Sequence, residues 1–198
     1  MCLLFETIKI IDGKPANIAR HNERMNAARK ELFSCSDMLD LREIIAVPEQ
    51  NRSGRHKCRV VYAKGICEIT FEPYPGRSIK SLKIVHCDDI EYPHKYCNRD
   101  NLNALFRLRG NCDDILIQKR EFVTDTSISN IAFFNGTRWL TPRSALLRGT
   151  KREHLLAEGL IAESDISAAD IRSFEKASLI NAMLDLGEIT IPAGSIVF

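Results

Sequence analysis

The chain has 198 residues, enough to bury a substantial core in one large domain or two small ones. It carries 28 basic and 26 acidic side chains, a formal net charge of +2, which gives no strong attraction to nucleic acid or to an anionic membrane. No apolar run approaches the roughly 20 residues that span a bilayer, and the opening stretch reaches Glu6 too early for a signal peptide. We therefore expect a cytoplasmic protein with a small-molecule partner.

Seven cysteines are scattered along the chain without a C-x-x-C pair, and an odd number cannot close into a complete set of disulfides. Reduced thiols in a reducing compartment fit this usage best. His94 with Cys97, or His86 with Cys87, could suggest zinc, but neither pair has a second pair of ligands at the spacing of a zinc site. We therefore predict no metal.

The first part of the chain has the pattern of a mixed α+β lobe. Residues 3–10 carry β-branched and aromatic side chains and end at the turn Asp12-Gly13, which predicts a strand. A helix is expected to follow, with Asn17 as its N-cap and four apolar side chains on one face. These side chains are Ile18, Met25, Ala28 and Leu32.

A second helix is expected to begin at Ser36 or Asp37 and to stop before Pro48, because a proline cannot continue a helix. Its apolar side chains would be Met38, Leu41 and Ile45. The polar stretch 49–57 is typical of a loop.

Two runs of strand-forming residues, 59–62 and 66–71, flank Lys64-Gly65 and predict a β-hairpin. Residues 82–86 predict one more strand, which we assign to the same lobe. The segment 88–94 contains a proline and has the composition of a linker.

We therefore expect an N-terminal lobe over residues 1–90 and a C-terminal lobe over 91–198. The second lobe has helical and strand patterns in turn. The expected elements are a helix around Leu102, Leu105 and Phe106, strands over 115–117 and 131–134 with a turn at Asn135-Gly136, helices over 150–158 and 168–174, and a strand near Leu179.

Three stretches carry chemistry, and they follow one another at intervals of about thirty and about twenty residues. The first is Lys95-Tyr96-Cys97-Asn98-Arg99, whose lysine can form a Schiff base. The second runs over 123–130 and contains Asp125, a carboxylate that can pair with a protonated ring nitrogen. The third, 147–152, contains Gly149-Thr150 at an expected helix start, where a phosphate can bind. Together they are what a pyridoxal phosphate site requires.

These stretches, in this order, resemble the class IV aminotransferases. That fold-type-IV pyridoxal phosphate family includes branched-chain aminotransferases, D-amino acid aminotransferase and aminodeoxychorismate lyase. The resemblance covers nearly the whole chain, because it also includes Phe5-Glu6-Thr7-Ile8, His21-Asn22-Glu23-Arg24 and Leu179-Ile180-Asn181-Ala182-Met183. Each stretch alone is a weak signal, but six in the right order make a chance match improbable.

The resemblance implies a two-lobed α+β fold like that of D-amino acid aminotransferase, with a smaller N-terminal lobe and a pseudo-barrel C-terminal lobe that binds the cofactor. It also implies a homodimer, because in this family the site is built at a dimer interface. Most members have about thirty residues before the Phe-Glu-Thr motif, which here begins at Phe5. A smaller first lobe is therefore expected, with an edge strand that a second subunit could cover.

The resemblance assigns cofactor-binding roles to particular residues, with pyridoxal 5'-phosphate as the cofactor. Lys95 is the expected catalytic lysine, whose pKa would be lowered by burial beside other cations. Asp125 stands where the family usually has glutamate, and would keep the pyridine nitrogen protonated. The phosphate ligands would be Arg24, Gly149, Thr150, Lys151, Asn181 and Ala182, with Lys151 replacing the usual threonine.

Substrate recognition is expected to involve Arg59 and Lys64, which align with positions that bind or flank carboxylates, and Tyr62 and Arg99, which would line the site. The alternatives without a catalytic or binding role are a solvated lysine at 95, a turn-capping aspartate at 125 and cationic side chains that only flank a hairpin.

The function implied is that of a pyridoxal phosphate enzyme acting on an amino acid or amino-carboxylate through a Lys95 Schiff base. A transaminase would release a keto acid, whereas an aminodeoxychorismate lyase would eliminate pyruvate; the Lys-x-x-Asn-Arg and Asn-Ala-Met stretches favour the lyase slightly. The alternative from another class is a non-catalytic relative that binds the cofactor or a metabolite.

Overall fold

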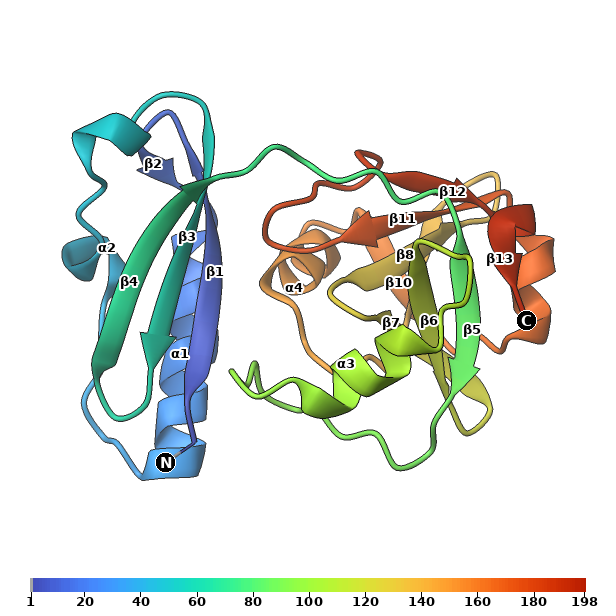
Figure 1. Cartoon of the computed structure of the whole chain (residues 1–198), viewed down its shortest axis with the longest axis horizontal. Helices are drawn as coiled ribbons and strands as arrows, with labels where there is room; N and C mark the ends of the chain where they lie inside the picture. Colours follow the sequence, from blue (N-terminus) through green and yellow to red (C-terminus); the bar gives the residue numbers. More distant parts are fainter. Residues whose placement is uncertain (1) are drawn as a thin grey trace. The chain divides into compact units, whose positions relative to one another are not determined.

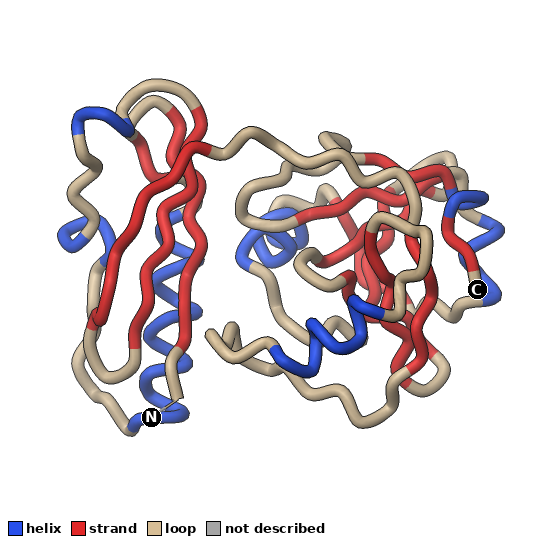
Figure 2. The backbone as a smooth tube through the Cα atoms, in the orientation of Figure 1, coloured by secondary structure: helices blue, strands red, loops and turns tan. Residues whose placement is uncertain are grey.

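The computed structural model describes residues 2–198, and its contacts divide the chain into two compact units (Figures 1 and 2). The first unit comprises the chain up to Gly76 together with His94–Asn98. The second comprises Arg77–Pro93 and Arg99–Phe198. The division therefore differs from the expected lobes 1–90 and 91–198, because residues 77–90 belong to the second unit and the short segment around Lys95 to the first.

The first unit is a four-stranded sheet with one long helix along one face (Figure 1). The strands lie in the order β2-β1-β3-β4, and all are antiparallel to their neighbours. They are β1 (Leu4–Ile11), β2 (Lys14–Pro15), β3 (Arg55–Tyr62) and β4 (Ile66–Pro73), and the helix is α1 (Ile18–Phe33). The predicted first strand and the hairpin around Lys64-Gly65 are confirmed.

Helix α1 is amphipathic and places Ile18, Met25 and Ala28 in the core against the sheet, as predicted. Leu32 was expected on the same face, but it is 37% exposed; the neighbouring Phe33 packs against the core at the end of the helix instead. Asn17 is the N-cap residue by position, with φ 53°, but its side chain makes no capping hydrogen bond.

The expected second helix is mostly absent, since only α2 (Leu41–Ile44) forms and Met38 is 75% exposed. The physical reason is that two side chains of α1 form hydrogen bonds with the backbone of this segment. Asn26 exchanges hydrogen bonds of 2.9 and 3.0 Å with the backbone carbonyl and N–H of Leu39, and Asn22 accepts from the N–H of Leu41 at 2.9 Å. These side chains take the backbone groups that a longer helix would have to pair internally.

The predicted polar loop is also shorter than expected. It contains a single 3-10 turn at Glu49–Asn51, and β3 already begins at Arg55.

The second unit contains two sheets, which contact each other through β7 (Phe122–Thr126) and β8 (Asn130–Phe134) (Figure 2). One has the order β10-β9-β8-β11-β12 and the other β13-β5-β6-β7. Within residues 2–198 they do not close into one hydrogen-bonded barrel. The remaining strands are β5 (Leu82–His86), β6 (Asp114–Lys119), β9 (Trp139–Pro142), β10 (Ile161–Ser164), β11 (Lys176–Ile180), β12 (Thr190–Pro192) and β13 (Ile196–Val197).

The strand over 82–86 forms as predicted, but its assignment to the first lobe is wrong. It is β5, and it pairs in parallel with β6, with Leu82 opposite Asp114. Such a pairing requires a long crossover connection, here the segment that carries Lys95 and α3 (Asp100–Arg107). Residues 94–98, which belong to the first unit, therefore lie within this crossover.

The other helices of the second unit are short. Helix α4 (Thr150–Ala157) matches the prediction. The stretch expected as a helix over 168–174 is a 3-10 helix, Ala169–Ser173, and a second 3-10 turn, Ala193–Ser195, precedes β13.

Across residues 2–198, no helix combines the length and apolar character needed to cross a membrane. The seven cysteines are all free thiols. The described part of the chain holds no group of three or more His, Cys, Asp or Glu residues suited to a metal ion.

Candidate functional site

Lys95 lies on a short segment that pairs with the edge of β1. The N–H of Phe5 donates to the carbonyl of Lys95 at 3.0 Å, and the N–H of Cys97 donates to the carbonyl of Leu3 at 2.8 Å. This edge is available because β2 is only two residues long and covers the other end of β1. The backbone that carries the lysine is therefore held by a sheet and not by a mobile loop.

A second cation shares the surroundings of Lys95. The Nζ of Lys95 lies 4.7 Å from the centroid of the Phe5 ring, and the guanidinium carbon of Arg59, on β3, lies 4.0 Å from the same centroid. Arg59 Nη2 also donates to Cys97 Sγ at 3.6 Å. The structure thus brings two of the predicted functional residues together around one aromatic ring, which is attractive to cations.

The two other hairpin residues are placed differently. Tyr62 is almost fully buried in the core beneath α1, and burial raises the pKa of its hydroxyl. Lys64 contributes its backbone carbonyl, which accepts from Arg29 Nε at 2.9 Å and Nη2 at 2.7 Å, while its side chain is exposed. Their roles in substrate recognition stay predictions.

Arg24 is part of a buried ionic network on the helix side of β1. Its Nε and Nη2 donate to the two carboxylate oxygens of Glu6 at 2.9 and 2.5 Å, and His21 Nδ1 lies 2.6 Å from Glu6 Oε2. Burial opposes ionisation of Glu6, but Arg24 and His21 outweigh it and lower its pKa to about 2. In the sequence, Glu6 and His21 were only parts of the matching motifs, with no role assigned. The structure shows that they hold Arg24, the predicted phosphate ligand.

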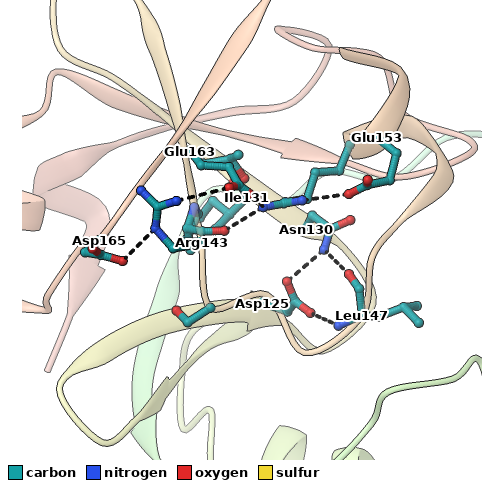
Figure 3. Close-up of polar contacts among 12 residues, drawn as sticks. Asp125, Asn130, Ile131, Arg143, Leu147, Glu153, Glu163 and Asp165 are labelled. Carbon is teal, nitrogen blue, oxygen red and sulfur yellow. Dashed lines mark hydrogen bonds and ion pairs between the residues drawn. The ribbon is translucent and has the colours of Figure 1, made fainter. Parts of the chain in front are cut away.

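Asp125 is a buried carboxylate on β7, only 6% exposed (Figure 3). Its Oδ1 accepts from Asn130 Nδ2 at 2.8 Å, and its Oδ2 accepts from the backbone N–H of Leu147 at 3.0 Å. Asn130 Nδ2 donates in addition to the carbonyl of Leu147 at 2.8 Å. The three residues therefore form a closed ring of hydrogen bonds, which Figure 3 shows between β7, β8 and the segment before α4.

Burial raises the pKa of Asp125 to about 6, although the N–H of Leu147, the amide of Asn130 and the charge of Arg152 each act in the opposite direction. Its hydrogen-bond donors are neutral, so they compensate the lost hydration only in part. The result is a carboxylate that is ionised at neutral pH but would be stabilised by a cation.

This raised pKa predicts a pH-dependent stability. Because the native state favours the protonated carboxyl, the stabilisation is complete below pH ~4 and is lost as the pH rises through about 6. A rise of the pKa from 3.8 to about 6 corresponds to on the order of 3 kcal/mol. We expect the free energy of unfolding of the apoprotein, relative to Asp125→Asn, to fall by about that amount between pH 4 and 7. A difference that does not change with pH in urea titrations would contradict the buried carboxylate.

The start of α4 lies directly beside this ring. Gly149 is the N-cap residue, no side chain caps the helix there, and the first intrahelical bond joins Glu153 N–H to the carbonyl of Gly149. The N–H groups of the first turn have no intrahelical acceptor, which is the arrangement by which helix N-termini can bind anions. A Cβ at Gly149 would overlap with Asn130 Oδ1, so glycine permits this close approach. Lys151 Nζ pairs with Asp185 at 2.5 Å, which leaves its backbone N–H as its contribution to an anion.

The turn at Asn181-Ala182 is attached to the same region. Asn181 Oδ1 accepts from the N–H groups of Met183 and Leu184 at 2.8 and 3.0 Å, and its Nδ2 donates to Ser129 Oγ at 2.8 Å. Since Ser129 precedes Asn130, the structure brings Asp125, the start of α4 and this turn together within the second unit.

Arg99 lies on the other side of the β7–β8 turn. Its Nη2 donates to the carbonyl of Ser127 at 2.5 Å, and it lines an open cavity of about 390 Å³ with Arg77, Asn103 and Phe106. This placement next to the segment that follows Asp125 is compatible with the predicted substrate role.

Asn130 is the functional candidate that the sequence reasoning did not single out. The strand predicted over 131–134 does not include it, whereas it is the first residue of β8. A polar amide at the head of an apolar strand, Asn-Ile-Ala-Phe-Phe, was the available signal, because buried amides need specific partners.

The described fold agrees with the comparisons with known proteins. The family model described as amino-transferase class IV matches residues 3–191, so the chain belongs to the class IV aminotransferase family. Its fold is that of the fold-type-IV pyridoxal phosphate enzymes.

Among individual proteins, an uncharacterized protein of Haemophilus influenzae is 40% identical over 182 residues, which are 91% of this chain and 97% of the relative. A crystal structure of a candidate 4-amino-4-deoxychorismate lyase from Haemophilus somnus has a TM-score of 0.88 at 34% identity and covers 94% of this chain and 98% of that one. The pyridoxal phosphate-bound structure of a hypothetical aminotransferase from Mycobacterium tuberculosis has a TM-score of 0.74, covering 94% of this chain and 80% of that one. At 18% identity, that last likeness concerns the fold alone.

Proposed function

We propose that this chain is a pyridoxal 5'-phosphate-dependent enzyme of the aminotransferase or aminodeoxychorismate lyase type, in which Lys95 carries the cofactor covalently. The observation that carries the proposal is the ring formed by Asp125, Asn130 and Leu147. It holds a buried carboxylate with neutral donors directly beside the N-terminal end of α4.

The residues of the second unit fit the chemistry of this cofactor. A carboxylate whose pKa burial raises to about 6 gains from a cationic partner, and a protonated pyridine nitrogen is such a partner. Each oxygen of Asp125 accepts one hydrogen bond in the ring and can accept a second. The end of α4 offers backbone N–H groups and a positive helix dipole to a phosphate.

Further groups that this chemistry uses are carried by residues of the first unit. Lys95 provides an amine on a fixed backbone segment, and after covalent exchange with substrate the same amine can take and return the α-proton. Arg59, which shares the Phe5 ring with Lys95, is the candidate for the substrate carboxylate. Arg24 is held against Glu6 through two of its nitrogens, which fixes the guanidinium that we propose as a phosphate ligand. When bound, the cofactor supplies an electron-accepting ring that stabilises negative charge at the substrate carbon.

We place the protein nearer to the lyase than to the transaminases. The support is the 34% identity to the Haemophilus somnus protein, together with the Lys-x-x-Asn-Arg and Asn-Ala-Met stretches at Lys95–Arg99 and Asn181–Met183. The substrate class we propose is an amino-carboxylate, either 4-amino-4-deoxychorismate or an α-amino acid.

The test separates the two reactions and the non-catalytic alternative. Purified protein reconstituted with pyridoxal 5'-phosphate should release pyruvate and 4-aminobenzoate from 4-amino-4-deoxychorismate, at a rate well above that of keto acid formation from a panel of L- and D-amino acids. Transamination without elimination would reverse the assignment between the two branches. No turnover with any substrate, despite a bound cofactor, would support a binding protein instead.

We also propose a cytoplasmic homodimer that interacts with neither nucleic acid nor membranes. The seven free thiols and the nearly balanced charge support the compartment, and the family resemblance supports the dimer. Light scattering of the purified protein would show twice the mass of 22.4 kDa if the dimer forms.

A further inference from the structure

One amide nitrogen holds two parts of the candidate cofactor site. Asn130 Nδ2 donates one hydrogen bond to the carboxylate of Asp125 and one to the carbonyl of Leu147, both at 2.8 Å. A side-chain amide nitrogen carries two hydrogens, so both are used and neither can be turned away without losing a bond. At 6% exposure, the side chain has little water to replace a lost partner.

The oxygen of the same amide faces the start of α4. A Cβ at Gly149 would overlap with Asn130 Oδ1, which means that the helix start packs directly on this atom. The N–H of Leu147 returns to Asp125 Oδ2 at 3.0 Å and closes the ring. Asn130 therefore touches both the carboxylate that would meet the ring nitrogen and the segment that leads into the phosphate end, as Figure 3 shows.

A buried asparagine can be merely structural, and the first unit contains such a residue. Asn26 is also 6% exposed, and its Nδ2 also donates two hydrogen bonds, to the carbonyls of Asn22 and Leu39. It fixes the segment before α2 and touches neither Asp125 nor α4. The two amides thus match in burial and donor count, and they differ in what they hold.

We propose that Asn130 is a positioning residue for the cofactor, which fixes the Asp125 carboxylate and the phosphate-binding start of α4 relative to each other through one amide. The inference rests on the proposed function. It assigns to Asn130 no contact with the cofactor or the substrate. It predicts that disturbing this amide weakens both the part of the site that meets the pyridine ring and the part that binds the phosphate.

The experiment compares apoprotein variants by their affinity for pyridoxal 5'-phosphate and for pyridoxal, which lacks the phosphate. The variants are Asn130→Asp, Asn130→Ser and, as a matched control, Asn26→Asp. Unfolding curves establish that each variant is folded, and if Asn130→Asp does not fold, Asn130→Ser provides the measurement. Hydrogen exchange of the peptide over residues 143–152 reports on the segment before α4 without any cofactor.

We expect the Asn130 variants to bind pyridoxal 5'-phosphate about tenfold or more weakly, the loss that corresponds to a hydrogen bond to a charged group. Pyridoxal should lose less affinity, because only the Asp125 side of the site affects it. Hydrogen exchange over residues 143–152 should be faster in the Asn130 variants and unchanged in Asn26→Asp. The affinity of Asn26→Asp for both ligands should stay within about twofold of wild type, which is the scatter expected of a site with no shared partners.

A pH profile distinguishes positioning from a general loss of stability. In Asn130→Asp two carboxyl groups would stand where a neutral amide faced one, so they must share a proton or repel each other. The affinity of this variant relative to wild type should therefore fall further as the pH rises from 5.5 to 8.5, whereas the ratio for Asn130→Ser should stay constant.

Two results would overturn the inference in distinguishable ways. If wild-type protein binds no pyridoxal 5'-phosphate, the proposed function fails and the positioning role fails with it. The other result is that wild type binds the cofactor and the folded Asn130 variants bind each ligand as tightly as wild type does, with unchanged hydrogen exchange over residues 143–152. In that case the proposed function stands and Asn130 is only a core amide.

Discussion

Asp125→Asn should lower turnover on the best substrate by on the order of a hundredfold or more, equivalent to at least about 2.7 kcal/mol of transition-state stabilisation. The substitution keeps the size of the side chain but removes the charge that would favour a protonated ring nitrogen. It also turns an amide nitrogen toward one of two donors, Asn130 Nδ2 or the Leu147 N–H, so part of the loss is positional. Cofactor should still bind, because the N–H groups at the start of α4 remain.

Asp125→Glu is the informative companion, because it restores the residue that the family usually has and keeps the charge. It should retain more activity than Asp125→Asn if the ring with Asn130 and Leu147 can accommodate one more methylene. Rates under saturating substrate and cofactor give the comparison. An Asp125→Asn variant as active as wild type would show that this carboxylate does not serve the ring nitrogen.

Arg24→Met should destabilise the protein by about 3 to 5 kcal/mol, the range for removing one partner of a buried ion pair. The carboxylate left behind, that of Glu6, is fully buried, and Arg24 is the main group that lowers its pKa to about 2. His21 alone cannot neutralise Glu6, since burial lowers the pKa of the imidazole. Urea unfolding at pH 7 measures the loss.

Two further variants make the cause specific. Glu6→Gln combined with Arg24→Met should recover a large part of the lost stability, because the uncompensated charge is gone. Arg20→Met, on the same helix, removes an exposed ion pair with Glu23 and should change the free energy of unfolding by at most about 1 kcal/mol. Equal effects of Arg20→Met and Arg24→Met would argue against the buried network.

The predicted phosphate contact of Arg24 is tested by the cofactor affinity of folded Arg24→Met. Loss of this contact should weaken cofactor binding by about 1.5 to 3 kcal/mol.

The regular elements of the fold were predictable wherever strand-forming residues flanked a clear turn. The runs 59–62 and 66–71 around Lys64-Gly65 predicted the hairpin, and the apolar run 131–134 before Asn135-Gly136 predicted β8 and its turn. The second helix was not predictable, because side chains of α1 that lie 13 and 19 residues away in the sequence take its backbone groups. The position of β5 could not be read locally either, since its partner β6 follows only after a long crossover.

The candidate site shows the same limit. The sequence indicated Lys95, Asp125 and Gly149 as bearers of chemistry, because their residue types and order carry the family resemblance. It did not indicate the contacts that hold Arg24 and Asp125, which are Glu6 beside Arg24 and Asn130 between Asp125 and Leu147. Such supporting contacts depend on which strands become neighbours, and that is a property of the tertiary structure.

The most direct measurement of the central claim is borohydride reduction of the protein with pyridoxal 5'-phosphate, followed by mass spectrometric mapping of the modified peptide. We expect the pyridoxyl group on Lys95 and loss of the visible absorbance band upon reduction. Lys95→Ala should show neither, while keeping the unfolding transition of wild type, because this lysine adds a nucleophile and little core volume. A pyridoxyl group on Lys64, Lys119 or Lys151 in the wild-type protein, or on no lysine at all, would contradict the assignment.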